Sequence, residues 1–217
     1  LKAVREQSRA QLLADLGPYS AMVEQLQGMT GRNFSWVRDV TLSNSIWGNR
    51  LLTLYHPRAG VHALGGGIGQ GMPMAIGAAV AAAENDPSRK VFALAGDGGF
   101  ILNLGELATL VQENANVVML LMNDQRYGVI RNIQDAVYGS RHCYVDLHTP
   151  DYAMLAESLN LRHARVTDLK DFASVVDVAL GQPGPFLLEV DMLSVGSFAT
   201  QFAGPPNSET KAQKATA

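Results

Sequence analysis

The sequence predicts an α/β domain in which a doubly wound, mostly parallel sheet carries helices on both faces. Short apolar runs alternate along the chain with longer amphipathic stretches, as strands and helices do in α/β proteins. The runs Val91–Ala95 and Val117–Met122 are apolar at every position rather than at every second one. Such runs indicate strands that are covered on both faces, as in a parallel sheet.

Length and composition limit the classes of protein that fit. With 217 residues, of which 47% are hydrophobic, the chain can form one well-packed domain. A net charge of −3 without a basic stripe argues against a nucleic-acid partner, and no apolar run is long enough for a membrane span. The single cysteine, Cys143, favours a reducing compartment, so we expect a cytoplasmic protein. Because the sequence opens inside a helical pattern without an initiator Met, we expect a piece of something longer.

Three segments are predicted in order along the chain. Residues 1–33 form an N-terminal helical segment or linker, in which Gly17-Pro18 breaks the helix. Residues 34–195 form the α/β domain, and residues 196–217 form a polar C-terminal tail. The strands expected in the domain are "FSWVRDV", "GVHALGG", "KVFALAG", "NVVMLLMND", "RHARVT" and "PFLLEVDM". The helices expected between them are Gly71–Ala83, Ile101–Glu113, Asp151–Leu159 and Leu169–Leu180.

Three motifs follow predicted strands directly. They are "GGGIGQGMP" (Gly65–Pro73), "GDGG" (Gly96–Gly99) and "NDQRYG" (Asn123–Gly128). Ligands of open parallel sheets bind beyond the carboxyl ends of the strands. Glycines there let the backbone approach a ligand closely, and the start of a helix suits a phosphate. The motifs therefore predict a phosphate-containing ligand at this edge of the sheet.

Asp97 and Asp124 explain how a phosphate could bind beside a carboxylate. Each follows an apolar run, and together they can hold a Mg²⁺ ion, which shares oxygen ligands with phosphates. Either motif alone would most simply be a turn, but the two together favour a site. A dinucleotide fingerprint fails on spacing, because the third glycine would fall on Gln70, Met72 or Met74, and no Walker sequence is present.

These motifs resemble the fingerprint of thiamine diphosphate-dependent enzymes. "GDGGFILNLGELATLVQENANVVMLLMND" matches the Gly-Asp-Gly to Asn-Asn or Asn-Asp pattern, with Asp97 and Asp124 separated by 27 positions. "GGGIGQGMPMAIGAA" is similar to the glycine-rich turn and helix upstream in the same family. The resemblance covers most of the chain and is to the C-terminal, diphosphate-binding domain of the acetolactate synthase, benzoylformate decarboxylase and pyruvate decarboxylase group.

The resemblance implies thiamine diphosphate and Mg²⁺ as cofactors and a role for each matching residue. Asp97, Asp124 and the backbone carbonyl of Arg126 would be the metal ligands. Ile68 would be the apolar wedge under the cofactor. The backbone carbonyl of Gly66 would accept a hydrogen bond from the amino group of the cofactor. The remaining cofactor-binding residues would be Gly67, Gly96, Gly98, Gly99, Tyr127, Gly128, Val129 and Ile130.

The resemblance also implies the reaction class and the partners. We expect the cofactor-binding part of an acetolactate synthase-like enzyme that decarboxylates or ligates small 2-oxo acids as a homo-oligomer. The activating glutamate would lie on an N-terminal pyrimidine-binding domain of the same or a neighbouring subunit, so no catalytic residue is expected here and the chain alone should be inactive. Ile130 stands where pyruvate decarboxylases carry glutamate, which argues against that subclass. The alternatives are a benzoylformate decarboxylase-like lyase and a non-catalytic module that keeps the fold. A phosphotransfer enzyme with Asp97 as nucleophile is disfavoured by Gly99 and Phe100 in its loop.

Overall fold

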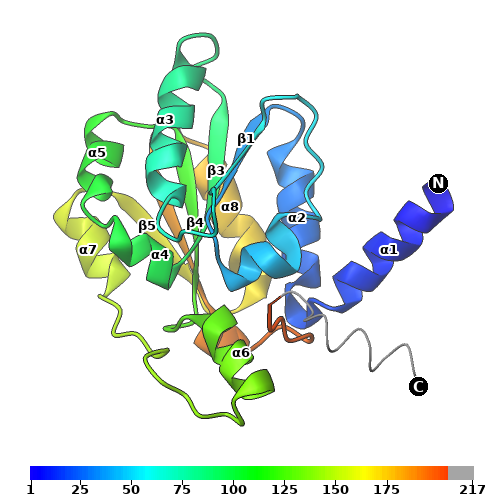
Figure 1. Ribbon diagram of the computed structural model, residues 1–217. Helices are drawn as coiled ribbons and strands as arrows, with labels where there is room; N and C mark the ends of the chain where they lie inside the picture. Colours follow the sequence, from blue (N-terminus) through cyan, green and yellow to red (C-terminus); the bar gives the residue numbers. More distant parts are fainter. Residues whose placement is uncertain (205–217) are drawn as a thin grey trace.

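The computed structural model describes residues 1–204, and these residues form a six-stranded sheet with the order β2-β1-β3-β4-β6-β5 (Figure 1). All five pairings between neighbouring strands are parallel. The predicted doubly wound parallel fold is therefore confirmed, and each predicted run contains a strand. The strands are β1 (Phe34–Arg38), β2 (Gly60–His62), β3 (Lys90–Gly96), β4 (Val117–Asn123), β5 (Arg162–Val166) and β6 (Phe186–Asp191).

Helices cover both faces of the sheet, as Figure 1 shows. One face carries α3 (Gly71–Ala83), α4 (Asp97–Leu102), α5 (Glu106–Gln112) and α7 (Tyr152–Ser158). The other carries α2 (Ser20–Thr30), α8 (Phe172–Leu180) and α9 (Met192–Val195). The remaining helices are α1 (Lys2–Ala14) and α6 (Gly128–Val137), with 3₁₀ turns at Gly17–Tyr19 and Leu169–Asp171 and a π-helix, η2, at Asn44–Gly48.

The central strands are apolar throughout because their two faces belong to two separate cores. In β3, Phe92 and Leu94 pack with α2 and α8. The residues that alternate with these two along the strand pack with α3 and α5; they are Val91, Ala93 and Ala95. This is the two-residue alternation of a strand, with both sides buried. A fully buried strand cannot slip by one residue without exchanging these cores, so the register at the carboxyl ends is fixed.

The structure differs from the sequence-based expectations at three places. The helix expected over residues 101–113 is two helices, because α4 already begins at Asp97 and the chain turns at Asn103 before α5. The segment after Asp39 has the polar sequence "TLSNSIWGN", which is typical of a loop, yet it contains the π-helix η2, in which Trp47 is fully buried. Helix α6, which was not predicted, follows the "NDQRYG" motif.

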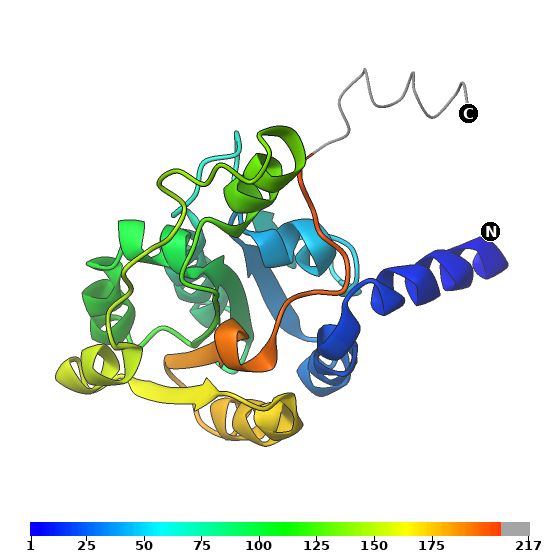
Figure 2. The same ribbon diagram turned by 90° about the horizontal axis from the view of Figure 1, so that it is seen from below.

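The two ends of the described chain pack differently. Helix α1 has no buried residue and projects away from the sheet (Figures 1 and 2). Tyr19, at the entry to α2, is fully buried and packs against Phe198, with 4.5 Å between ring centroids. Segments before residue 34 and after residue 195 thus contribute to the core beside the sheet, while the predicted division at these boundaries stays a prediction. Residues 205–217 of the predicted tail lie outside the described residues.

None of the helices in residues 1–204 combines the length and the apolar character that a membrane crossing requires.

Candidate functional site

A cavity of about 620 Å³ lies at the carboxyl ends of the central strands. All thirteen residues that the sequence predicted to bind cofactor or metal line this single cavity, although they come from three motifs far apart in the chain. The cavity is also lined by seven residues that were not predicted: Val40, Thr41, Leu42, Ser45, Ile133, Phe202 and Gly204. The strand-end motifs therefore converge on one site.

Asp97 is the buried carboxylate at the floor of this cavity. It is only 1% exposed and begins α4 directly after β3. Its Oδ2 atom is buried without a hydrogen-bond partner. Burial, and after it the charge of the nearby Asp124, raise the pKa of Asp97 well above its usual range. A buried charge without a partner is costly, so this oxygen needs a cation or a proton.

Asp124 follows β4 and faces the same space. The pKa of Asp124 is also raised by burial, although the charge of Arg126 opposes the rise. Two neighbouring carboxylates, of which Asp97 is fully buried with an unpartnered oxygen and Asp124 is half-buried, are a donor set that suits Mg²⁺. Within the described residues no three His, Cys, Asp or Glu side chains converge on one point. Backbone oxygen, phosphate and water would therefore complete the coordination of a metal here.

The turn after β4 is held in an unusual conformation. Gln125 has a φ of +54°, in the left-handed region that non-glycine residues seldom adopt. Asn123, the last residue of β4, braces the turn because its Oδ1 accepts from the Gln125 backbone N–H at 3.3 Å. The Asn123 amide in turn donates to Glu189 of β6 at 2.8 Å. Asp124 is thus presented by a strained turn that is anchored to the neighbouring strand.

The glycine-rich turn forms the opposite wall. Gly66 and Gly67 are exposed, and Ile68 is half-buried where it lines the cavity. Gln70 braces the turn, since its amide donates to the carbonyls of Leu64 and Gly67, both at 2.9 Å. The backbone groups of Gly66 and Ile68 are therefore held in place before any ligand binds.

Helix α6 supplies an apolar wall. Val129, Ile130 and Ile133 line the cavity from this helix, and Ile130 remains 48% exposed. Phe202, from the segment after α9, closes the same side, and its carbonyl accepts from the Asn132 side chain at 3.1 Å. The cavity is thus carboxylate-lined at its floor and apolar toward its mouth.

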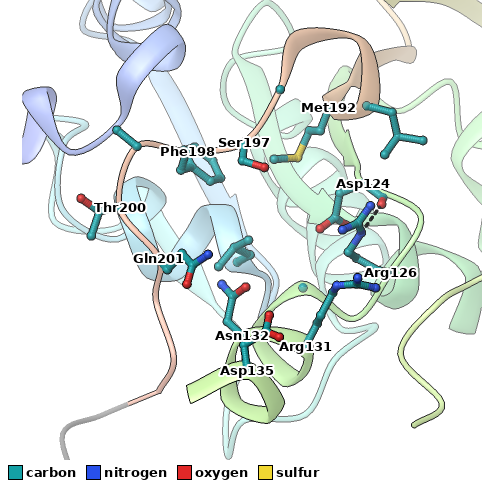
Figure 3. Close-up of a pocket in the computed structure, with 15 residues that line it drawn as sticks. Asp124, Arg126, Arg131, Asn132, Asp135, Met192, Ser197, Phe198, Thr200 and Gln201 are labelled. Atoms are coloured by element: carbon teal, nitrogen blue, oxygen red, sulfur yellow. Dashed lines mark hydrogen bonds between the residues drawn. The ribbon is translucent and has the colours of Figure 1, made fainter. Parts of the chain in front are cut away.

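A second, polar cavity of about 260 Å³ adjoins the first. It lies between α6 and the segment after α9, and Asp124 and Arg126 lie at one side of it (Figure 3). Leu42, Asp124, Arg126 and Gly128 line both cavities. The Arg126 Nε–H donates to the Asp124 carbonyl at 2.9 Å, which holds the guanidinium beside this residue.

Two buried groups near the site were missed from the sequence. Asp39, at the end of β1, is 1% exposed and accepts from the Gly69 backbone N–H at 2.9 Å. Glu189 is 3% exposed and contacts Asn123 and His163. Asp39 also follows a strand, so the strand-end reasoning used for Asp97 and Asp124 would have found it. Nothing local marks Glu189, because it lies within an otherwise apolar run.

Comparison with known proteins places this geometry in a family. Residues 42–190 match the model of the thiamine pyrophosphate enzyme C-terminal TPP binding domain, thiamine pyrophosphate being another name for thiamine diphosphate. Acetolactate synthase 2 of Brassica napus is 34% identical over 156 residues, which are 68% of this chain and 24% of that protein. The acetolactate synthase large subunit of Cyanidium caldarium is 34% identical over 126 residues, 57% of this chain and 21% of its own. The chain thus spans less than a quarter of the length of these relatives.

Solved structures agree with the fold. A thiamine diphosphate-dependent 4-hydroxybenzoylformate decarboxylase from Rhodococcus jostii superposes with a TM-score of 0.70 at 25% identity, over 78% of this chain and 31% of that one. A benzoylformate decarboxylase from Polynucleobacter necessarius gives 0.73 at 19% identity, over 83% of this chain and 33% of that one, and supports the fold alone. The chain belongs to the thiamine diphosphate-dependent enzymes and contains their C-terminal cofactor-binding domain.

Proposed function

We propose that this chain is the diphosphate-binding part of an enzyme that uses thiamine diphosphate and Mg²⁺ to decarboxylate or ligate 2-oxo acids. The unpartnered Asp97 Oδ2 supports this most strongly, because it lies beside Asp124 in a cavity lined by all thirteen predicted residues. When bound, thiamine diphosphate supplies the nucleophilic carbon and the electron sink for cleaving or forming a bond next to a carbonyl.

The residues of the chain would bind and orient the cofactor. Asp97, Asp124 and the Arg126 carbonyl would hold the metal, and the Gly98 and Gly99 N–H groups would bind the diphosphate. At the other wall, the Gly66 carbonyl and the Ile68 backbone N–H would bind the aminopyrimidine. The Ile68 side chain would support the cofactor from below, and Val129 and Ile130 would exclude water from the reacting side. The other predicted residues, Gly67, Gly96, Tyr127 and Gly128, would shape the cavity around it.

Calorimetry tests the cofactor assignment. Thiamine diphosphate should bind the chain in Mg²⁺ and not in EDTA, because the diphosphate would otherwise face two carboxylates. Asp97→Ala should abolish this binding. Asp86→Ala, which removes a half-buried carboxylate just before β3 and therefore at the opposite end of that strand, should leave it unchanged. Equal affinity with and without metal would contradict the site.

The proposed activity requires a longer protein with an N-terminal pyrimidine-binding domain. No glutamate is among the described residues that line the cavity, so the activating carboxylate would come from that domain. We therefore expect the chain alone to release no CO₂ from pyruvate or benzoylformate, even with both cofactors saturating. Turnover that is absent from an Asp97→Ala preparation, purified in the same way, would show that this chain contains the activating acid.

A second substrate class has specific support. The relatives at 34% identity are acetolactate synthases, whereas one solved structure at 25% identity is a 4-hydroxybenzoylformate decarboxylase. The longer protein should be assayed for acetolactate from pyruvate and for benzaldehyde from benzoylformate. Acetolactate formation would support an acetolactate synthase-like enzyme, and benzaldehyde alone would support a benzoylformate decarboxylase-like enzyme. The absence of both products would favour a non-catalytic module.

A further inference from the structure

Besides the apolar wall from α6, the cofactor cavity has two polar walls that come from different parts of the fold. One wall is the glycine-rich turn with Gly66 and Ile68, between β2 and α3. The other is the start of α4, with Asp97, Gly98 and Gly99. A ligand that spans both walls binds well only if their separation is set in advance.

Gly69 is the point at which the two walls are joined. Its backbone N–H donates to Asp39 Oδ2 at 2.9 Å. Its carbonyl accepts from the Asn103 side chain, at the end of α4, at 2.6 Å. Both polar groups of this one peptide are therefore bonded to side chains from other elements. Gly69 has a φ of +91°, a conformation that favours glycine, and a Cβ there would lie 2.9 Å from Asn103 Nδ2.

Asp39 is itself held firmly. Its backbone N–H donates to the Leu94 carbonyl of β3 at 2.9 Å, and its Oδ1 accepts from the Val40 N–H at 2.8 Å. The backbone N–H groups of Gln70 and Gly71 also point at the carboxylate. Such donors favour the ionised form and oppose the effect of burial, which raises the pKa of Asp39.

Asp39 also contacts the second wall directly. A Cβ at Gly99 would lie 2.7 Å from Asp39 Oδ2 and 3.1 Å from the Gly69 backbone nitrogen. The backbone of α4 therefore packs against both the carboxylate and the turn that the carboxylate holds. Asp39 does not line the cavity, so it would act through the backbone around it.

We propose that Asp39 and Asn103 clamp Gly69 and thereby fix the glycine-rich turn against the start of α4, which sets the separation of the two cofactor-binding walls. Asp39 is on this account a positioning residue, and the inference rests on the proposed function for its link to the cofactor. A simpler role for Asp39, as a cap of α3 alone, would lower stability without changing affinity for the cofactor.

Asp39→Asn is the main test, because asparagine has nearly the same shape as aspartate. Its NH₂ group replaces one carboxylate oxygen, so one backbone N–H loses its acceptor and faces a donor. Hydrogen exchange at Gly69–Gly71 in the unliganded chain should be faster in this variant. The affinity for thiamine diphosphate in Mg²⁺ should fall about tenfold, the loss expected for a hydrogen bond to a charged group. Asn103 is half-buried, so Asn103→Ala should cost less folding stability than a substitution of the buried Asp39. It should accelerate the same exchange and also weaken cofactor binding.

Asp151→Asn is the matched control. Asp151 Oδ1 caps α7 by accepting from the Met154 N–H at 3.0 Å, and it does not line the cavity. This variant keeps an amide oxygen that can cap α7, so it should change stability little and keep cofactor affinity. Unchanged exchange at Gly69–Gly71 in Asp39→Asn and Asn103→Ala would overturn the clamp. Faster exchange with wild-type affinity would overturn its link to the cofactor. A wild-type chain that binds no cofactor would overturn the proposed function, and the exchange data would still decide whether the clamp exists.

Discussion

Asp97 and Asp124 repel one another when both are ionised, and burial adds to the cost of charging either. We expect Asp124→Asn to remove this repulsion and to raise the free energy of unfolding, without metal, by about 1 kcal/mol, the value of one pKa unit. The variant keeps an oxygen ligand, so Mg²⁺-dependent binding of thiamine diphosphate should persist. Urea unfolding and calorimetry measure the two effects. Lower metal-free stability in this variant would show that the two carboxylates do not repel.

Gly69 has a left-handed backbone and is crowded by Asn103. Gly69→Ala should therefore destabilise the fold by about 1–2 kcal/mol, from backbone strain and from the contact with Asn103. Gly77→Ala is the control, because Gly77 lies within α3 and an added Cβ meets nothing within 4 Å. Alanine there should be neutral or stabilise the helix by up to about 1 kcal/mol. Equal effects of the two substitutions would contradict the assigned role of Gly69.

At the scale of elements, the buried Glu189 of β6 joins side chains of the neighbouring strands β4 and β5. Glu189 accepts from Asn123 at 2.8 Å and contacts His163 at 3.2 Å and Arg165 at 3.6 Å. Glu189→Ala would leave the buried Asn123 amide without an acceptor, so unfolding free energy should fall by about 1–3 kcal/mol. Glu157→Ala, on the exposed face of α7, should change it by less than about 0.5 kcal/mol. Similar urea midpoints for both variants would show that the network contributes little.

The sequence predicted elements well where one local pattern decided them. Strands β3 and β4 and helix α3 were expected, because an apolar run and a helix rich in small residues can each be recognised from the local sequence alone. The π-helix was not expected, because the polar residues of "TLSNSIWGN" are typical of a loop, and its burial depends on Trp47 packing beside Trp36 at 5.8 Å between centroids. Helix α6 was missed because its first residues belong to the predicted binding motif.

In the candidate site, too, the features set by the local sequence were predicted and those set by long-range contacts were not. Asp97, Asp124 and the glycine motifs are consecutive in sequence with their strands, so strand-end reasoning located them. The Asp39–Gly69 contact joins residues 30 positions apart, and the Asn123–Glu189 contact joins residues 66 apart. No spacing pattern marks such pairs, because they exist only through the order of strands in the sheet.

At the scale of the whole molecule, α6 leaves apolar side chains exposed beside the cavity. Val137 is 55% exposed and Tyr138 is 53% exposed, next to Ile130 at 48%. Exposed apolar patches favour association, so we expect the chain to be a dimer or larger on sizing. Val137→Lys should weaken this association at least about tenfold, which corresponds to 1.4 kcal/mol.

Val178→Lys is the control for this prediction. Val178 is 61% exposed on α8, so the substitution adds the same charge at a similar exposure on another helix. It should leave the sizing profile unchanged. A monomeric wild-type chain, or equal loss of association in both variants, would rule out α6 as the associating surface.

The central claim is that Asp97 and Asp124 hold a divalent cation that also binds the diphosphate of the cofactor. A crystal structure of the chain with Mn²⁺ and thiamine diphosphate tests it most directly, since Mn²⁺ replaces Mg²⁺ and is located by its anomalous signal. The account predicts one anomalous peak about 2.1 Å from oxygens of Asp97, Asp124 and the diphosphate. A cofactor bound in the cavity with its metal remote from Asp97, or a metal on these carboxylates without the diphosphate, would contradict it.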